Sequence, residues 1–267
     1  MPLLQSIVLA LIQGVTEFIP ISSSGHLVLV REWFGWSDEN GVFFDVVLHA
    51  ASLLAIFVYF FRDWLQMLFA AVRWRDDALK ADRLLLGQLI AATIPMALLG
   101  PWLEPYMDVF RRGGVIGLIM ILTALWFLFC EWRPAARREK LTWGAVLLMG
   151  LAQVLAVLPG ASRSGLTIST GVLAGQRRVH AARFSFFMVA PIIVGALILK
   201  SLRLPSEALN GMLWPLLTGF AVCFSTSLAC IHFCLGLFRR YSLSMFAFYL
   251  IGMGVALLLC NSSRFWF

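Results

Sequence analysis

Charged residues are scarce in this chain of 267 residues: they make up 13%, whereas hydrophobic residues make up 61%. A soluble domain of ordinary composition is about 25% charged and about 45–50% apolar. So few polar side chains cannot cover a water-facing surface, which excludes an ordinary soluble protein. The composition and the length favour one compact domain within a lipid bilayer.

Cysteine is also sparse, and the patterns that would give it a role are missing. The five cysteines lie in apolar stretches and none has Cys-x-x-Cys spacing, so we expect neither a disulfide nor a cysteine metal site. The net charge of +7 comes without a zinc-finger pattern or an arginine-rich tract, which argues against a nucleic-acid partner. Residues 1–12 lack the pattern of a signal peptide, so we expect them in the mature fold.

Long apolar runs dominate instead. Crossing a bilayer as a helix takes about 17–25 residues. Six stretches reach that length, at 43–61, 84–101, 113–130, 183–199, 213–235 and 244–260. Two others, 1–34 and 142–174, are interrupted by Pro, Gly and Ser at 20–25 and 159–165. Because irregular backbone at membrane depth must be shielded or line a wet cavity, both predict re-entrant helical hairpins.

The two interrupted segments resemble each other at an offset of 140 residues, which pairs Gln13 with Gln153 and Ser22–Gly25 with Ser162–Gly165. We predict an all-α polytopic membrane protein with six transmembrane helices and two re-entrant hairpins. Each half holds one hairpin and three spans, and this odd number inverts the second half relative to the first. The predicted ranges are 1–267 for the single membrane domain, 1–131 for the first inverted repeat and 142–260 for the second.

Basic residues divide unevenly between the two sides of this layout. Most of them fall in the loops after the first, third and fifth spans and in the link after the second hairpin. Loops rich in Lys and Arg face the cytoplasm. The other side, with both termini and the mouth of the first hairpin, is therefore predicted to face outward.

Glu17 lies far from either predicted end of the first hairpin. A carboxylate at membrane depth is costly and marks a functional candidate, although a loop residue that reaches water is the simpler alternative. Gln13 lies one helical turn earlier and shares the face of Glu17, so the pair could hold a cation. Asp45 and His49 share another helix face and could support the site.

The residues after Pro20 read as a helix start with serine as its cap. Exposed backbone N–H groups at such a start bind phosphate, which makes Ser22 and Ser24 candidate phosphate ligands. Ser23 and His26 lie three residues apart on one face. A serine becomes a nucleophile when a base such as histidine takes its proton. The alternative is a row of capping serines beside a histidine bonded to backbone.

Arg163 is the basic residue deep within the second hairpin, and its guanidinium suits forked binding of phosphate oxygens. Ser162, Ser164 and Thr167 are candidate phosphate ligands beside it. A structural alternative is an ion pair between Arg163 and Glu17. Together, the hairpins would aim two helix N-termini, hydroxyls and an arginine at one point, which suits a diphosphate on a lipid tail and predicts phosphoryl transfer.

The segments Gln13–His26 and Pro159–Thr167 resemble the two signatures of the undecaprenyl-diphosphate phosphatase family, which is also known for bacitracin resistance. The resemblance implies hydrolysis of undecaprenyl diphosphate to undecaprenyl phosphate and phosphate, which recycles the lipid carrier for peptidoglycan and other cell-wall polymers. It implies a bacterial inner membrane. Because the first hairpin enters from the side predicted to face outward, we expect the site to open to the periplasmic face. The implied catalytic residues are Glu17, Ser23, His26 and Arg163.

The resemblance also implies a divalent cation, Mg²⁺ or Ca²⁺, held by Glu17 and Gln13, and a homodimer. The family often has Glu where this chain has Gln13, so the cation would have one charged ligand fewer. Either Ser23 with His26 as base, or His26 itself, could attack phosphorus. A transporter or flippase of a phosphorylated polyprenyl lipid shares the architecture and stays as the alternative, although a carrier needs no nucleophile.

Overall fold

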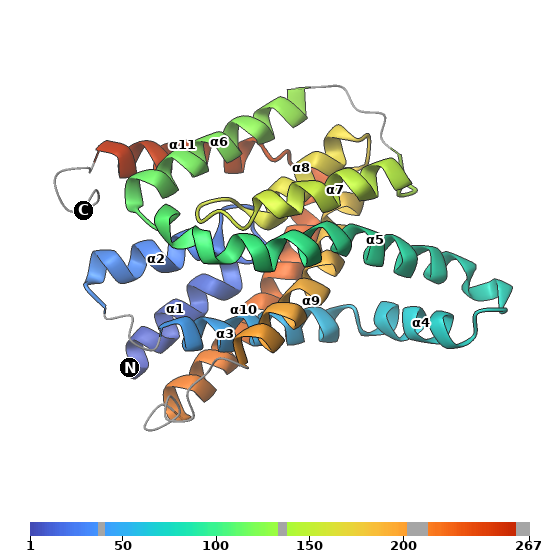
Figure 1. Cartoon of the computed structure of the whole chain (residues 1–267), viewed down its shortest axis with the longest axis horizontal. Coiled ribbons are helices and arrows are strands. Elements are labelled where there is room, and N and C mark those ends of the chain that lie inside the picture. The colour runs from blue at the N-terminus through green and yellow to red at the C-terminus, as the bar shows by residue number, and fades with distance from the viewer. Residues whose placement is uncertain (37–40, 133–137, 202–212, 260–267) are drawn as a thin grey trace.

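A computed structural model shows an all-helical molecule (Figure 1). It describes residues 1–36, 41–132, 138–201 and 213–259, and within these ranges it holds no β-strand. The α-helices are α1 (Leu3–Thr16), α2 (Ser23–Phe34), α3 (Gly41–Tyr59), α4 (Phe61–Val72), α5 (Lys80–Leu103), α6 (Gly113–Trp132), α7 (Trp143–Leu155), α8 (Arg163–Leu173), α9 (Arg178–Ser201), α10 (Leu213–Arg240) and α11 (Ser244–Leu259); η1 (Asp77–Leu79) and η2 (Glu104–Phe110) are 3-10 helices.

Several helices are long and apolar enough to cross a bilayer. Four helical stretches meet this criterion in the described part of the chain: Asp77–Met107, Gly113–Trp132, Arg178–Leu199 and Leu213–Arg240. The pair α3 and α4 adds a fifth if the two helices, which are bent by 79°, form one broken span. The expected all-α polytopic membrane protein is confirmed at this level.

Helix α4 was not predicted, because the sequence pattern placed a loop after residue 61. The break between α3 and α4 falls at Phe60, whose φ is −103° and ψ is 28°. Neither Gly nor Pro marks this break, so the pattern alone could not separate a second helix. The end of the last predicted span at 260, with Cys260, lies outside the described residues, as do Arg133, Arg137, Arg203 and Arg264 of the predicted loops.

Each hairpin turns at a serine-capped helix start. Pro20 cannot continue α1, and α2 begins after Ser22, whose Oγ accepts a hydrogen bond from the Gly25 N–H at 3.4 Å. The second hairpin repeats this plan, since Ser162 Oγ accepts from the Gly165 N–H at 3.1 Å where α8 begins. The sequence signals for both helix starts therefore act as expected.

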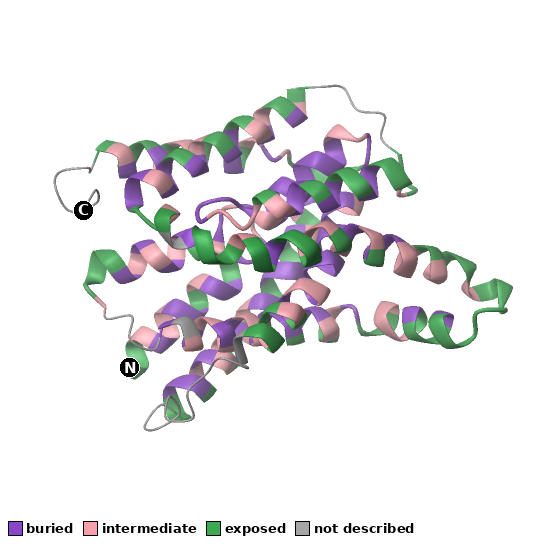
Figure 2. Ribbon diagram, viewed as in Figure 1, coloured by how far each residue is buried: buried purple, intermediate pink, exposed green. Residues whose placement is uncertain are grey.

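The tips of the two hairpins touch at the centre of the molecule, where buried residues gather (Figure 2). A side-chain carbon on Gly25 would lie 3.4 Å from the Cα of Gly160. Gly160 has a φ of 91°, and a side-chain carbon there would lie 2.7 Å from the carbonyl oxygen of Ile116 on α6. Only glycine accommodates both this backbone conformation and this close approach.

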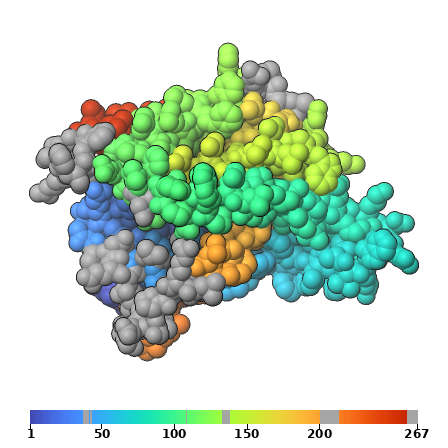
Figure 3. Space-filling model, viewed as in Figure 1, coloured from blue at the N-terminus to red at the C-terminus, as the bar shows by residue number. Residues whose placement is uncertain are grey.

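The surrounding helices pack in pairs, and each of the two predicted halves contributes one helix to every pair. Helix α1 packs against α10, α7 packs against α5, and α6 packs against α11. The main apolar core includes Phe18, Phe127, Phe186 and Phe187, and Phe18 meets Phe186 edge to face with ring centroids 5.2 Å apart. Helices α5, α6 and α7 form the central and upper part of the face seen in Figure 3, beside parts of α2, α4 and α9. The hairpin tips lie against α6, at Ile116, Met120 and Phe127.

Candidate active site

Glu17 is the centre of a polar cluster built by both hairpins. Glu17 is only 6% exposed, and its carboxylate forms an ion pair with the guanidinium of Arg163 from the second hairpin. The side-chain amide of Gln13 donates to Glu17 Oε2 at 2.9 Å, and the ring of His49 places Nε2 4.0 Å from the same oxygen. A carboxylate at this depth is stabilised because opposite charge and hydrogen-bond donors surround it.

Ser23 points at the same carboxylate. Its hydroxyl donates a hydrogen bond to Glu17 Oε2 at 2.8 Å. The sequence pattern predicted His26 as the partner of Ser23, but the structure gives that place to Glu17. The physical reason is local: Ser23 is the first residue of α2, so its side chain faces back toward the end of α1, where Glu17 lies. Glu17 is therefore the base within reach of this hydroxyl.

His26 has partners for both ring nitrogens. Nδ1 lies 2.7 Å from the carbonyl oxygen of Ser22, and Nε2 lies 2.7 Å from the hydroxyl of Tyr249 on α11. The imidazole and phenol rings also stack, with centroids 5.8 Å apart and an interplanar angle of 12°. Tyr249 was missed in the sequence, because a tyrosine within an apolar span carries no motif and usually reports only packing or an interface.

The predicted phosphate ligands divide into two groups. Ser22 and Ser162 are buried helix caps, and Ser24 is exposed beside them. Ser164 links the hairpins, since its hydroxyl donates to the Ile19 carbonyl at 3.4 Å. Thr167 is turned away, because its hydroxyl bonds to its own helix and to Ser185 Oγ at 2.6 Å. Thr167 therefore supports α8, whereas the four serines lie at or beside the hairpin tips.

A second layer of polar groups supports the cluster from α2 and α3. Arg31 and Asp45 form a two-pronged ion pair with N–O distances of 2.9 and 2.6 Å. His49 Nδ1 lies 2.7 Å from the Asp45 carbonyl, and because a carbonyl only accepts, Nδ1 carries the proton. Nε2 is the ring nitrogen that faces Glu17.

The donor set can take a divalent cation only with help from a ligand. Within the described residues no cluster of three or more His, Cys, Asp or Glu side chains could hold a metal ion. Gln13 Oε1, however, is buried and has no hydrogen-bond partner, whereas Nε2 of the same amide donates to the Glu17 carboxylate. Mg²⁺ commonly binds one or two carboxylates and fills its shell with phosphate oxygens and water. Glu17 and Gln13 fit such a partial site.

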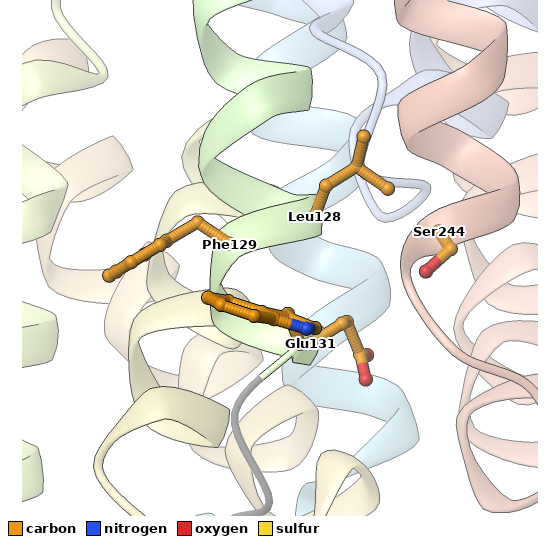
Figure 4. A pocket seen from close by; sticks show the side chains of 5 residues that line it. Leu128, Phe129, Glu131 and Ser244 are labelled. Atoms are coloured by element: carbon orange, nitrogen blue, oxygen red, sulfur yellow. The ribbon is translucent and has the colours of Figure 1, made fainter.

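A cavity of about 490 Å³ lies elsewhere (Figure 4). Leu128, Phe129, Glu131, Trp132 and Ser244 line it, at the end of α6 and the start of α11. The hairpin tips meet α6 at Ile116, Met120 and Phe127, and none of these residues lines the cavity. Its only charged lining residue, Glu131, is paired with Arg178 and would repel a phosphate. The polar cluster, and not this cavity, is therefore the candidate site for phosphoryl transfer.

Comparison with known proteins identifies the family of this chain. A family model described as bacitracin resistance protein BacA matches residues 6–256. The chain belongs to the BacA family. The BacA match spans both hairpins and α3, and it includes Tyr249 on α11, so every side chain of the polar cluster lies within it.

Similar BacA-family proteins carry one name, undecaprenyl-diphosphatase. The protein from Rubrobacter xylanophilus is 41% identical over 258 residues, which cover 92% of this chain and 94% of that protein. The protein from Alteromonas mediterranea is 38% identical over 267 residues, covering 97% and 98%. The protein from Trichlorobacter lovleyi is 38% identical over 264 residues, covering 97% of each. The predicted family is therefore confirmed over nearly the whole chain.

Proposed function

We propose that this chain is an undecaprenyl-diphosphatase, which hydrolyses undecaprenyl diphosphate to undecaprenyl phosphate and inorganic phosphate. Relatives that share its full length carry this name. The observation that carries the proposal is the junction of the hairpins, where Ser23 and Arg163 meet on the carboxylate of Glu17. The reaction recycles the lipid carrier of cell-wall polymers such as peptidoglycan, and recycling accounts for resistance to bacitracin.

In the first step Ser23 is the nucleophile. Its oxygen forms a bond to the terminal phosphorus, the bond from that phosphorus to the bridging oxygen breaks, and undecaprenyl phosphate leaves with the electron pair. The proton of Ser23 passes to Glu17, which already accepts its hydrogen bond. Neutralising Glu17 removes the partner charge of Arg163, so the guanidinium becomes available to the phosphoryl oxygens.

In the second step water attacks the phosphoserine. A P–O bond to water forms, the bond from phosphorus to Ser23 breaks, and Glu17 returns the proton to the serine oxygen. His26 takes the proton of the water through Nε2, because Nδ1 already donates to the Ser22 carbonyl. For this step water takes the place of the Tyr249 hydroxyl, which lies 2.7 Å from Nε2 in the structure. His26 afterwards releases the proton to solvent, and Ser23 remains the nucleophile.

The helix starts and the cation complete the anion site. Helices α2 and α8 both begin at the junction, so their free N–H groups and positive ends face the diphosphate. Ser22, Ser24, Ser162 and Ser164 surround it. Mg²⁺ or Ca²⁺, held by Glu17 and Gln13 Oε1, would neutralise phosphate charge when bound. Thr167 acts indirectly, by holding α8.

The proposed topology has six transmembrane helices and two re-entrant hairpins in inverted repeats. The reciprocal packing of α1 on α10 and α7 on α5 supports two related halves. The start of α1 and the end of α2 lie at the left of Figure 1, and the start of α7 and the end of α8 lie toward its right. With the arginine-rich side in the cytoplasm of a bacterial inner membrane, the first hairpin opens to the periplasm. We also propose that the protein forms a homodimer, as the family resemblance implies.

Phosphate release from undecaprenyl diphosphate by the purified protein in detergent tests this function. We expect stoichiometric phosphate and undecaprenyl phosphate, identified by mass spectrometry, and chelation of divalent cations should stop the reaction. Reconstituted liposomes separate the alternative function. If a folded, cation-supplied protein moves labelled lipid between leaflets but releases no phosphate, the chain is a lipid transporter and not a hydrolase.

A further inference from the structure

The polar cluster reaches the surface of the molecule between α2 and α11. Helix α2 packs on α1 and α11 packs on α6, whereas α2 and α11 do not pack closely on each other within the described residues. His26 and Tyr249 join the two helices by a hydrogen bond of 2.7 Å and a stacked pair of rings. Tyr249 is 42% exposed, beside the exposed apolar residues Met245 and Phe248. Because polar groups that face lipid are costly, this partly exposed pair marks where the site meets the bilayer.

The contact also covers a group that the proposed reaction needs. Ser23 and His26 lie one turn apart on α2, and Ser23 donates to the buried carboxylate of Glu17 at 2.8 Å. In the neutral ring of His26, Nδ1 donates to the Ser22 carbonyl, so Nε2 holds the one lone pair. The Tyr249 hydroxyl lies on this nitrogen. Water can reach Nε2 only after Tyr249 has moved away.

Small residues leave room on α11 next to Tyr249. Gly252 lies one turn further along the helix, and a side-chain carbon added there would have no atom within 4 Å. Ala256 lies two turns further along, and both residues are exposed. We call the space between α2 and α11 beside these three residues the α2–α11 seam. A lipid that places its diphosphate at Ser23 must pass its prenyl tail out into the bilayer, and the seam begins one turn from Ser23, at His26.

We infer that the α2–α11 seam is a lateral gate for the lipid substrate, and that the contact of Tyr249 with His26 is the latch that closes it. This inference rests on the proposed function, because it gives undecaprenyl diphosphate its route to the site. Movement of Tyr249 opens the seam for the tail and uncovers Nε2 of His26 for water. The resting protein is the closed form, and the bound lipid stabilises the open form.

Removing the hydroxyl of Tyr249 tests the latch. Tyr249→Phe keeps the ring and loses the hydrogen bond, so the open form becomes more populated and kcat/KM should rise by up to about tenfold. Damage to the fold would lower activity and cannot produce this gain. Tyr59→Phe is the matched control, since Tyr59 bonds to His232 at 3.0 Å between α3 and α10, away from the cluster. We expect this control to behave as wild type.

Filling the seam tests the route of the tail. Gly252→Trp places a large side chain in the space beside Tyr249. It should raise KM for undecaprenyl diphosphate and Kd for undecaprenyl phosphate by about tenfold, with little change in kcat. Gly236→Trp is the control, because Gly236 is an exposed glycine of α10 that also has no atom within 4 Å of an added carbon. Binding of undecaprenyl phosphate requires no turnover, so this measurement does not depend on catalysis.

The outcomes separate the gate from the proposed function. An active wild type with no gain in Tyr249→Phe, or with equal KM in Gly252→Trp and Gly236→Trp, overturns the gate alone. A folded wild type that binds undecaprenyl phosphate and releases no phosphate contradicts the proposed function. In that case the Kd values of the two tryptophan variants decide the gate, and equal values overturn it. A gain in Tyr249→Phe together with weaker lipid binding in Gly252→Trp supports the gate.

Discussion

Glu17 shows how one buried side chain can serve several steps. It accepts from Ser23 and Gln13 while it neutralises Arg163. Removing one partner of a buried ion pair leaves the other charge uncompensated, which typically costs about 3–5 kcal/mol. A proton delivered by Ser23 instead neutralises the carboxylate within the reaction. The charges in the resting cluster therefore compensate one another until substrate and proton transfer change the balance.

Substitution of Gln13, again a single residue, tests whether its side chain binds the proposed divalent cation. Gln13→Glu replaces the amide nitrogen that donates to Glu17 with an oxygen, and it gives a negative charge to the group whose Oε1 has no partner. Because divalent cations bind carboxylates more tightly than amides, the cation concentration for half-maximal phosphate release should fall by about tenfold. Gln13→Leu removes the oxygen and should raise that concentration. Equal cation requirements in both variants and in wild type would rule out a ligand role for Gln13.

The contacts of single residues were the part least accessible from sequence. The candidates Glu17, Ser23, His26 and Arg163 could be chosen because polar groups at membrane depth are costly and need a reason. The ion pair of Arg163 with Glu17 was offered as an alternative and is present. The partner of Ser23 could not be predicted, since Ser23 and His26 share a helix face and yet turn to different elements. Tyr249 was invisible for a related reason: it is 223 residues from His26 in sequence, and only the tertiary fold joins them.

At the scale of elements, the account depends on how closely the hairpin tips approach. Gly160→Ala would add a carbon 2.7 Å from the Ile116 carbonyl at a residue with a φ of 91°. We expect strain of about 1–3 kcal/mol, a lower Tm in detergent and reduced phosphate release, because the tip carrying Arg163 is displaced. Gly195→Ala is the control, since no atom lies within 4 Å of the added carbon. Equal Tm and activity in the two variants would show that the tip tolerates displacement.

The elements divide into those with a strong sequence signal and those without one. The hairpins could be predicted because Pro, Gly and Ser interrupt apolar runs at both tips, and the structure begins α2 and α8 at the expected caps. Helix α4 could not, because a bend of 79° at Phe60 has no breaker residue. Its direction is set by packing against α5, which the local pattern does not encode.

At the scale of the whole molecule, the proposed orientation predicts from which side of the membrane a given residue can be reached. Ser24 lies exposed at the first hairpin, and Arg75 lies exposed in the turn between α4 and α5. In intact cells a membrane-impermeant maleimide should label Ser24→Cys from outside. Arg75→Cys should react only after permeabilisation. The four described native cysteines are buried, which limits background labelling. The opposite pattern would place the site on the cytoplasmic face.

The most direct test of the central claim is a double-mutant cycle across the two hairpins, read as phosphate release from undecaprenyl diphosphate. If Ser23 and Arg163 act in one site, each alanine variant should lose on the order of 100-fold or more in kcat/KM. The double variant should then lose little beyond the worse single variant, because groups that act as a unit are not additive. Independent, additive losses, or an Arg163→Ala variant as active as wild type, would contradict the claim that the hairpins form one catalytic centre.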